Sequence, residues 1–265
     1  MKSLQINGEL LTYTDYGNPA SPAIIMLSGW AQDYRLFKNV APILAESYYV
    51  ICPDYRGHNP DMLLCADFTS DDLASDIVEL VKRLELTKFH LVSHSHGCWV
   101  NIEICERLGY ATLDKTVLID WLMEPHPGFD RQLADGQDIE LYAAGRKSMA
   151  DEWASKTDNE DVLNHIYNEM PSFGGAMWRR ACREIAKGYA KWGSPLERMS
   201  ALERKPAVAH IFSQPLAQAY RDMQADFAKL NPWFTPVYIA GETHFPSLEN
   251  GPQVAAAILA HLAPT

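Results

Sequence analysis

The most informative stretch of the sequence is Phe89-His90-Leu91-Val92-Ser93-His94-Ser95-His96-Gly97-Cys98-Trp99. Its first four residues form an apolar run typical of a buried strand, and a polar turn and a helical pattern follow. A serine at such a turn, with a glycine two residues later to permit close packing, points its hydroxyl above the end of the strand. Ser95 is therefore a candidate catalytic residue, and the alternative is that it only caps the next helix.

The turn resembles the nucleophile elbow of the α/β-hydrolases, whose usual pattern G-x-S-x-G has Ser93 here in place of the first glycine. That resemblance implies an acid and a histidine, each beyond a strand end. His244 lies after the last predicted strand and before the last predicted helix. Asp120 follows the predicted strand 116–119, whereas the strand 207–212 is followed by Ser213 and no carboxylate. A surface histidine and a turn-forming aspartate are the alternatives.

Two backbone N–H groups complete the set that the resemblance implies. The family places one of them in the loop after the strand 23–27, here at Trp30, and the other on the residue after the serine, here His96. Both are candidates to stabilise a developing negative charge as an oxyanion hole. His94 and His96 form an H-x-H pair, but no third ligand lies at a sensible spacing. We expect no metal, and His94 is assigned to substrate binding.

Alternating strand and helix patterns must position these residues. Helical spacing of Leu73, Ile77, Leu80, Val81 and Leu84 after Thr69 or Ser70 predicts a helix between two of the strands, and Pro252 opens the last helix. This alternation predicts an α/β-hydrolase fold, a mostly parallel sheet with helices on both faces. The predicted strands are 9–16, 23–27, 48–52, 89–92, 116–119, 207–212 and 236–240.

The alternation stops between the strands 116–119 and 207–212. Residues 124–205 are predicted to form a helical cap subdomain rich in aromatic side chains, inserted before the last two strands into a core domain of residues 1–123 and 206–265. Such an insertion commonly lies over the carboxyl ends of the strands, where open α/β sheets bind ligands.

Composition limits the classes of function. The chain has 265 residues, with 23 Lys and Arg against 34 Asp and Glu, so its formal net charge is −11. This charge argues against nucleic-acid binding. We find no apolar run of the roughly 18 residues that span a membrane and no secretory signal. Five scattered cysteines, Cys65 among them, fit reduced thiols. We therefore expect a cytoplasmic protein.

The combination of Ser93-His94-Ser95-His96-Gly97, Asp120-Trp121 and an aromatic cap resembles the cofactor-independent ring-cleaving dioxygenases. This resemblance implies a small 3-hydroxy-4-oxoquinoline-type N-heteroaromatic substrate, dioxygen as co-substrate, and no cofactor. His244 and Asp120 would act as a general base on the 3-hydroxyl, and carbon monoxide and N-formylanthranilate would be released. Ser95 would orient the substrate by hydrogen bonding.

A flat bicyclic substrate needs apolar walls, for which Trp153, Trp178 and Phe129 are the candidates. The alternative is that these three side chains belong to the core of the cap. A serine esterase or carbon–carbon bond hydrolase with the same three catalytic residues remains the second hypothesis for function, and a binding module without catalysis the third. The sequence leaves the ring substituent and the oligomeric state open.

Overall fold

The computed structural model describes residues 1–62, 66–109 and 112–263. The described residues form an eight-stranded sheet in the order β1-β2-β4-β3-β5-β6-β7-β8. The pairs β1/β2 and β2/β4 are antiparallel and the other neighbours are parallel. The strands are β1 (Lys2–Ile6), β2 (Glu9–Tyr16), β3 (Ala23–Leu27), β4 (Tyr49–Asp54), β5 (Phe89–His94), β6 (Leu113–Ile119), β7 (Ala207–Phe212) and β8 (Phe234–Tyr238).

Three of the predicted strands, 9–16, 23–27 and 207–212, have the bounds of β2, β3 and β7. The strand predicted at 236–240 is wrong by two residues, because β8 pairs with β7 from Phe234 to Tyr238. The first strand, β1, is a mostly exposed edge strand that is not among the predicted strands. The Asn7-Gly8 pair in the sequence could have indicated this strand, because it is typical of a tight hairpin turn. Its positive φ angles of 50° and 85° allow the turn that joins β1 to β2.

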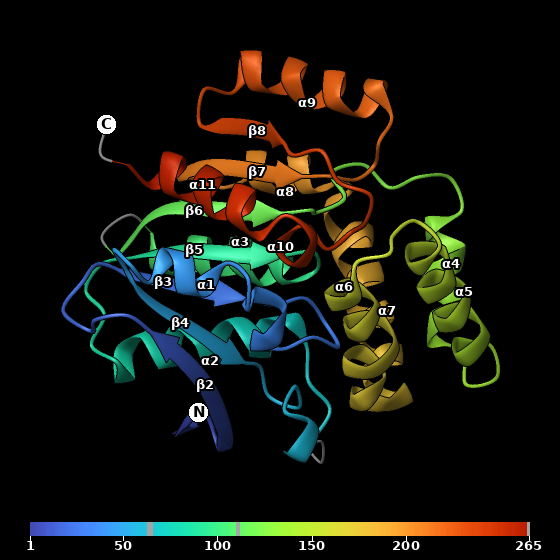
Figure 1. Cartoon of the computed structure of the whole chain (residues 1–265), viewed down its shortest axis with the longest axis horizontal. Coiled ribbons are helices and arrows are strands. Elements are labelled where there is room, and N and C mark those ends of the chain that lie inside the picture. Colours follow the sequence, from blue (N-terminus) through green and yellow to red (C-terminus); the bar gives the residue numbers. More distant parts are fainter. Residues whose placement is uncertain (63–65, 110–111, 264–265) are drawn as a thin grey trace.

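Helices cover both faces of the sheet (Figure 1). Packed side by side on one face are α2 (Ser70–Arg83) and α3 (Gly97–Leu108), while α1 (Ala41–Leu44) and α11 (Gly251–Leu262) lie on the other. Successive residues of β3 alternate between the two cores: Ile25 and Leu27 pack with α2, and Ile24 and Met26 with α1. This period of two is the geometry of a strand buried on both faces.

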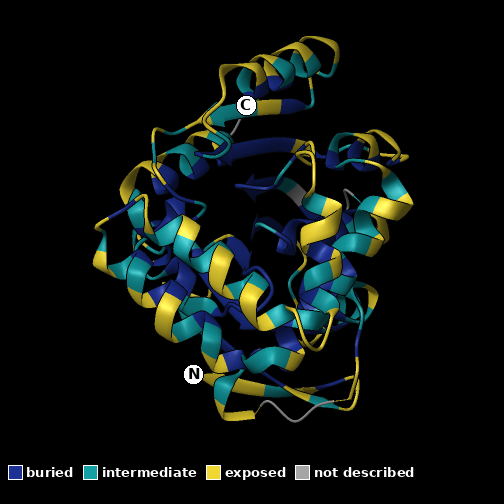
Figure 2. Ribbon diagram, turned by 90° about the vertical axis from the view of Figure 1, so that its right-hand side faces the viewer, coloured by how far each residue is buried: buried dark blue, intermediate teal, exposed yellow. Residues whose placement is uncertain are grey.

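Helices connect β6 to β7 and stand beyond the carboxyl ends of the strands (Figure 1). They are α4 (Phe129–Gln137), α5 (Tyr142–Ala154), α6 (Glu160–Asn164), the π-helix η3 (His165–Glu169), the 3-10 helix η4 (Met170–Phe173), α7 (Gly174–Trp192) and α8 (Pro195–Ser200). Figure 2 shows their exposed residues on the outer surface and the strands buried behind them. We propose that they make up the cap subdomain of residues 124–205.

The remaining elements are short, except α9. Two 3-10 helices, η1 (Tyr34–Phe37) and η2 (Pro60–Met62), flank β4, α9 (Gln218–Leu230) joins β7 to β8, and α10 (Pro246–Glu249) precedes α11. No helix in the described part of the chain is long and apolar enough to cross a membrane.

The turn between β5 and α3 depends on close backbone packing. Ser95 has a φ of 51°, in the left-handed region that is costly for a side-chain-bearing residue. A Cβ atom on Gly97 would lie 2.2 Å from the carbonyl oxygen of Ser28. Gly97 thus lets the start of α3 contact the loop after β3, and this contact brings that loop next to Ser95.

Six of the described histidines are buried, and in four of them, His58, His94, His96 and His210, burial shifts the pKa of the ring. Burial disfavours the charged imidazolium and lowers the pKa of His58 and His210 to about 4 and that of His94 to about 3. Burial also lowers the pKa of His96. All four rings are therefore neutral in the folded protein near pH 7.

Replacing Gly97 by alanine is expected to destabilise the protein by several kcal/mol and to lower its activity, because the neighbouring atom is backbone and cannot rotate away. Denaturant unfolding measures the loss. Gly145→Ala in α5 is the matched control, because nothing lies within 4 Å of its Cβ position, and it should stabilise by up to about 1 kcal/mol. Equal stability of the two variants would contradict the packing argument.

The buried histidines predict that stability falls as the pH is lowered from about 6.5 to about 4. In this window the unfolded chain binds protons on histidines that the folded protein keeps neutral, so protonation favours unfolding. The expected loss is about 1.4 kcal/mol per pH unit for each such histidine. Urea unfolding at pH 7, 6, 5 and 4.5 measures it, and a flat profile would contradict the burial of neutral rings.

Candidate active site

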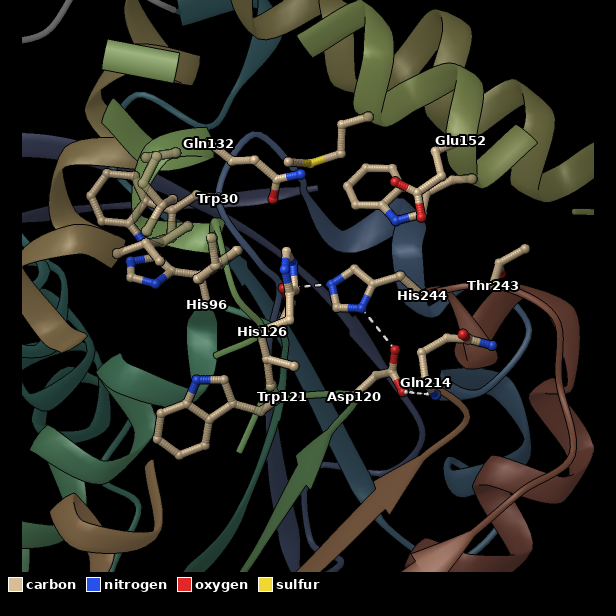
Figure 3. A pocket seen from close by; sticks show the side chains of 18 of the residues that line it. Trp30, His96, Asp120, Trp121, His126, Gln132, Glu152, Gln214, Thr243 and His244 are labelled. Atoms are coloured by element: carbon tan, nitrogen blue, oxygen red, sulfur yellow. Dashed lines mark hydrogen bonds and ion pairs between the residues drawn. The ribbon is translucent and has the colours of Figure 1, made fainter. Parts of the chain in front are cut away.

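Three side chains meet beyond the carboxyl ends of the parallel strands, and Figure 3 shows two of them, Asp120 and His244. Ser95 follows β5, Asp120 follows β6, and His244 lies in the loop between β8 and α10. The Nδ1–H of His244 donates to Asp120 Oδ2 at 2.7 Å, and the Ser95 hydroxyl donates to His244 Nε2 at 2.7 Å. Because a carboxylate only accepts hydrogen bonds, its contact fixes the proton on Nδ1 and leaves Nε2 free to take one.

Asp120 is held as a buried anion. Burial alone would raise the pKa of its carboxyl group, but hydrogen bonds from His244 and from the backbone N–H groups of Ser213 and Gln214 outweigh burial and hold that pKa below its ordinary value. The two N–H groups lie 2.7 and 3.0 Å from Oδ1. The end of β7, which carries no carboxylate of its own, thus provides the donors that keep the acid of β6 charged.

The loop after β3 is folded against Ser95. The backbone N–H of Gly29 donates to Gln32 Oε1 at 2.8 Å, and the Ser28 hydroxyl donates to the Gln32 carbonyl oxygen at 3.0 Å. A Cβ atom on Gly29 would lie 3.4 Å from the Cβ of Ser95. Trp30 and His96, the two residues predicted to supply oxyanion-hole N–H groups, line one cavity, and their rings are 4.9 Å apart.

This cavity, of about 640 Å³, lies between the sheet and the cap helices and includes all three residues of the hydrogen-bonded set. Trp153 stacks on His244, with ring centroids 5.6 Å apart and an interplanar angle of 20°. Trp178 and Phe129 also line the cavity. The three predicted aromatic side chains therefore line the same cavity as His244, and its volume is in the range of small-molecule sites.

The cavity is also lined by aromatic residues that were not among the predicted walls. Trp99 and Trp121 meet edge to face with centroids 4.9 Å apart, and Tyr189 contacts Trp99 in the same way at 5.3 Å. Their positions carried a signal, because Trp99 lies in the first turn after the elbow and Trp121 directly follows the acid. Residue type alone did not separate them from core aromatics.

The assignment of His94 to substrate binding is wrong. Its side chain is fully buried and is absent from the cavity lining. Its Nε2–H donates to the carbonyl oxygen of His244 at 2.8 Å, and its Nδ1 lies 3.1 Å from Gln32 Oε1. Alternation along β5 directs this ring into the protein between the two loops of the site, so His94 supports these loops and does not contact substrate.

The donor groups for a metal ion are sparse. Among the residues that the structure describes, no group of three or more His, Cys, Asp or Glu side chains could share one ion. The cysteines Cys52, Cys98, Cys105 and Cys182 are buried free thiols. Cys65 lies outside the described residues.

Known proteins share both the sequence and this architecture. The family model of the alpha/beta hydrolase family matches residues 24–257. The 1H-3-hydroxy-4-oxoquinoline 2,4-dioxygenase of Pseudomonas putida is 56% identical over 97% of this chain and 98% of its own. The 2-heptyl-3-hydroxy-4(1H)-quinolone dioxygenase of Mycobacteroides abscessus is 37% identical over 95% and 94%.

A solved structure of 1H-3-hydroxy-4-oxoquinoline 2,4-dioxygenase superposes with a TM-score of 0.97 at 55% identity, covering 99% of this chain and 100% of that one. The predicted fold class is thereby confirmed. The chain belongs to the alpha/beta hydrolase family and, within it, to the quinolone ring-cleaving dioxygenases.

Proposed function

We propose that this protein cleaves 3-hydroxy-4-oxoquinoline-type N-heteroaromatics with dioxygen and without a cofactor, and that His244 is the general base. One observation carries the proposal: the His244 ring, oriented by the Asp120 carboxylate at 2.7 Å, presents its unprotonated Nε2 to an aromatic cavity. An imidazole paired with a carboxylate is suited to taking a proton near neutral pH.

The first step is removal of the 3-hydroxyl proton of the substrate by His244 Nε2. The Asp120 carboxylate stabilises the imidazolium that forms, as it does in a catalytic triad. The substrate becomes an electron-rich anion and is itself the electron donor to dioxygen, which is why the proposed reaction needs neither metal nor flavin.

Dioxygen then bonds to C2 of the anion, and the distal oxygen of the resulting peroxide bonds to C4. The O–O, C2–C3 and C3–C4 bonds break, and C3 leaves as carbon monoxide. One oxygen atom ends in the formyl group formed from C2 and the other in the carboxylate formed from C4. The product is N-formylanthranilate, and both atoms of dioxygen are incorporated.

The remaining site residues orient the substrate. The Ser95 hydroxyl, now hydrogen-bonded to His244 Nε2, donates to a substrate oxygen once the substrate occupies that position. The backbone N–H groups of Trp30 and His96 stabilise negative charge that develops on the 4-oxo group. Trp153, Trp178 and Phe129 supply apolar walls for the bicyclic ring.

The second sequence hypothesis, a serine esterase or carbon–carbon bond hydrolase, is not favoured. Its catalytic residues have the required geometry, but the relative that shares 56% of the sequence over nearly the full length is a dioxygenase. Identical geometry thus serves a different reaction, because function on this fold is decided by the site and its substrate.

The function is tested with an oxygen electrode. Metal-stripped protein with 3-hydroxy-4-oxoquinoline is expected to consume one dioxygen and release one carbon monoxide per substrate. 4-Oxoquinoline is the matched control substrate, because it has no 3-hydroxyl proton to lose, and it should give no oxygen uptake. Oxygen uptake that appears only after iron or flavin is added would contradict the cofactor-free reaction.

Substitution of the two polar side chains at the base separates their roles. His244→Ala should lower kcat by about 10²–10⁴-fold, the usual contribution of a positioned general base. Ser95→Ala should lower it by only about 10-fold, the value of one hydrogen bond to a charged group. His261→Ala in α11, at the far end of the sheet, is the control. Equal and complete loss in the first two variants would instead indicate an acyl-enzyme.

A further inference from the structure

The turn that carries Asp120 is strained and depends on outside contacts. Asp120 has a φ of 48°, in the left-handed region, although it has a side chain. Its own N–H donates to the Ile211 carbonyl oxygen at 2.8 Å. From this point the backbone leaves β6, so the N–H of Trp121 needs an acceptor that the sheet does not supply. In Figure 3 the two side chains point to different sides, with Asp120 directed towards His244 and the Trp121 ring away from it.

The acceptor for the Trp121 N–H is a histidine side chain. His210 of β7 places Nε2 3.2 Å from this N–H and Nδ1 2.5 Å from Gln224 Oε1 in α9. A backbone N–H can only donate, so Nε2 must be unprotonated and Nδ1–H donates to Gln224. The ring is therefore held in one neutral tautomer, in agreement with the burial that lowers its pKa to about 4.

The two hydrogen bonds of His210, to the Trp121 N–H and to Gln224, account for a polar ring at this position. It is fully buried and does not line the cavity. Val208 and Phe212, which share its face of β7, are apolar and belong to one buried cluster. The ring stacks on Phe212 with centroids 5.0 Å apart and an interplanar angle of 5°. An apolar residue would fill the space but would leave the buried Trp121 N–H without a partner.

The rest of the turn is held in the same manner. The Tyr220 hydroxyl of α9 lies 3.2 Å from the carbonyl oxygen of Trp121, to which it donates, and accepts from the Met123 N–H at 2.8 Å. The Tyr189 hydroxyl of α7 donates to the carbonyl oxygen of Leu122 at 2.6 Å. Of these contacts, the one made by His210 is nearest in the chain to Asp120.

We propose that His210 is a positioning residue of the reaction: its ring accepts the Trp121 N–H and so fixes the left-handed turn from which Asp120 presents its carboxylate to His244. The proposal rests on the proposed function, in which His244 is the general base. A turn released at Trp121 lets the carboxylate rotate or move away from His244, and misplacements of about 1 Å in a catalytic group can cost about 100-fold in rate.

Two substitutions of His210 differ in the acceptor that they leave. His210→Leu removes it, whereas His210→Gln keeps a side-chain oxygen near the position of Nε2. Val208→Ala, on the same face of β7 and in the same buried cluster, is the control for loss of core packing, because the valine side chain accepts no hydrogen bond from the turn. Far-UV circular dichroism and thermal unfolding establish that each variant is folded at the assay temperature.

We expect His210→Leu to lower kcat by about 10- to 100-fold with little change in KM, His210→Gln to recover most of the loss, and Val208→Ala to keep the wild-type kcat. Two further readouts follow the base itself. Under anaerobic conditions His210→Leu should bind 3-hydroxy-4-oxoquinoline but convert less of it to the anion, seen by absorbance. The low-field proton resonance of the His244 Nδ1–H, identified by its absence in His244→Ala, should weaken.

Wild-type kcat and anion formation in His210→Leu would overturn the proposal, and so would an equal loss in His210→Gln or in Val208→Ala. Failure of the proposed function has a different signature, because wild-type protein would then form no substrate anion and consume no oxygen. The low-field resonance reports the Asp120 to His244 contact without any turnover, so it tests the positioning role in either case.

Discussion

A buried carboxylate that must stay charged is the constraint on which the site depends. Asp120 is almost completely buried, so its charge must be stabilised by hydrogen-bond donors from the protein. His244 donates to one carboxylate oxygen, and the backbone N–H groups of Ser213 and Gln214 donate to the other. These donors come from segments that follow β7 and β8. The hydrogen-bonded pair of Asp120 and His244 can therefore form only when the last three strands are assembled in register, which makes the site depend on the completed sheet.

The sheet and the helices of residues 124–205 contribute different groups to the site, because the sheet is the more rigid of the two. The polar groups lie directly at the strand ends, because side chains held by a buried sheet are positioned more precisely than side chains on long loops. The inserted helices supply apolar and aromatic surface such as Trp153 and Trp178, where position matters less than the exclusion of water. Both parts contribute to the cavity, since its floor comes from the sheet and its walls come mostly from the helices.

The geometry also explains how a hydrolase fold can serve an oxygenase reaction. A serine hydrolase uses its histidine to remove a proton from the serine, and here the same Nε2 faces a cavity large enough for an aromatic substrate that brings its own acidic hydroxyl. In the proposed reaction Ser95 is then one of several groups that hydrogen-bond the substrate. The His244 and Asp120 pair keeps its role as base in this proposed reaction, and the group that loses the proton is the substrate hydroxyl.

Periodicity, turn residues and chain position are local signals, and they are sufficient to predict the alternation of strands and helices, the turn at Ser95, and the order of Ser95, Asp120 and His244. Which side chains meet follows only from the folded structure. It turned His94 away from the cavity, brought His210 to the Trp121 N–H across 89 residues of chain, and added Trp99 and Trp121 to the walls. Such contacts depend on strand register and helix packing, which no local pattern encodes.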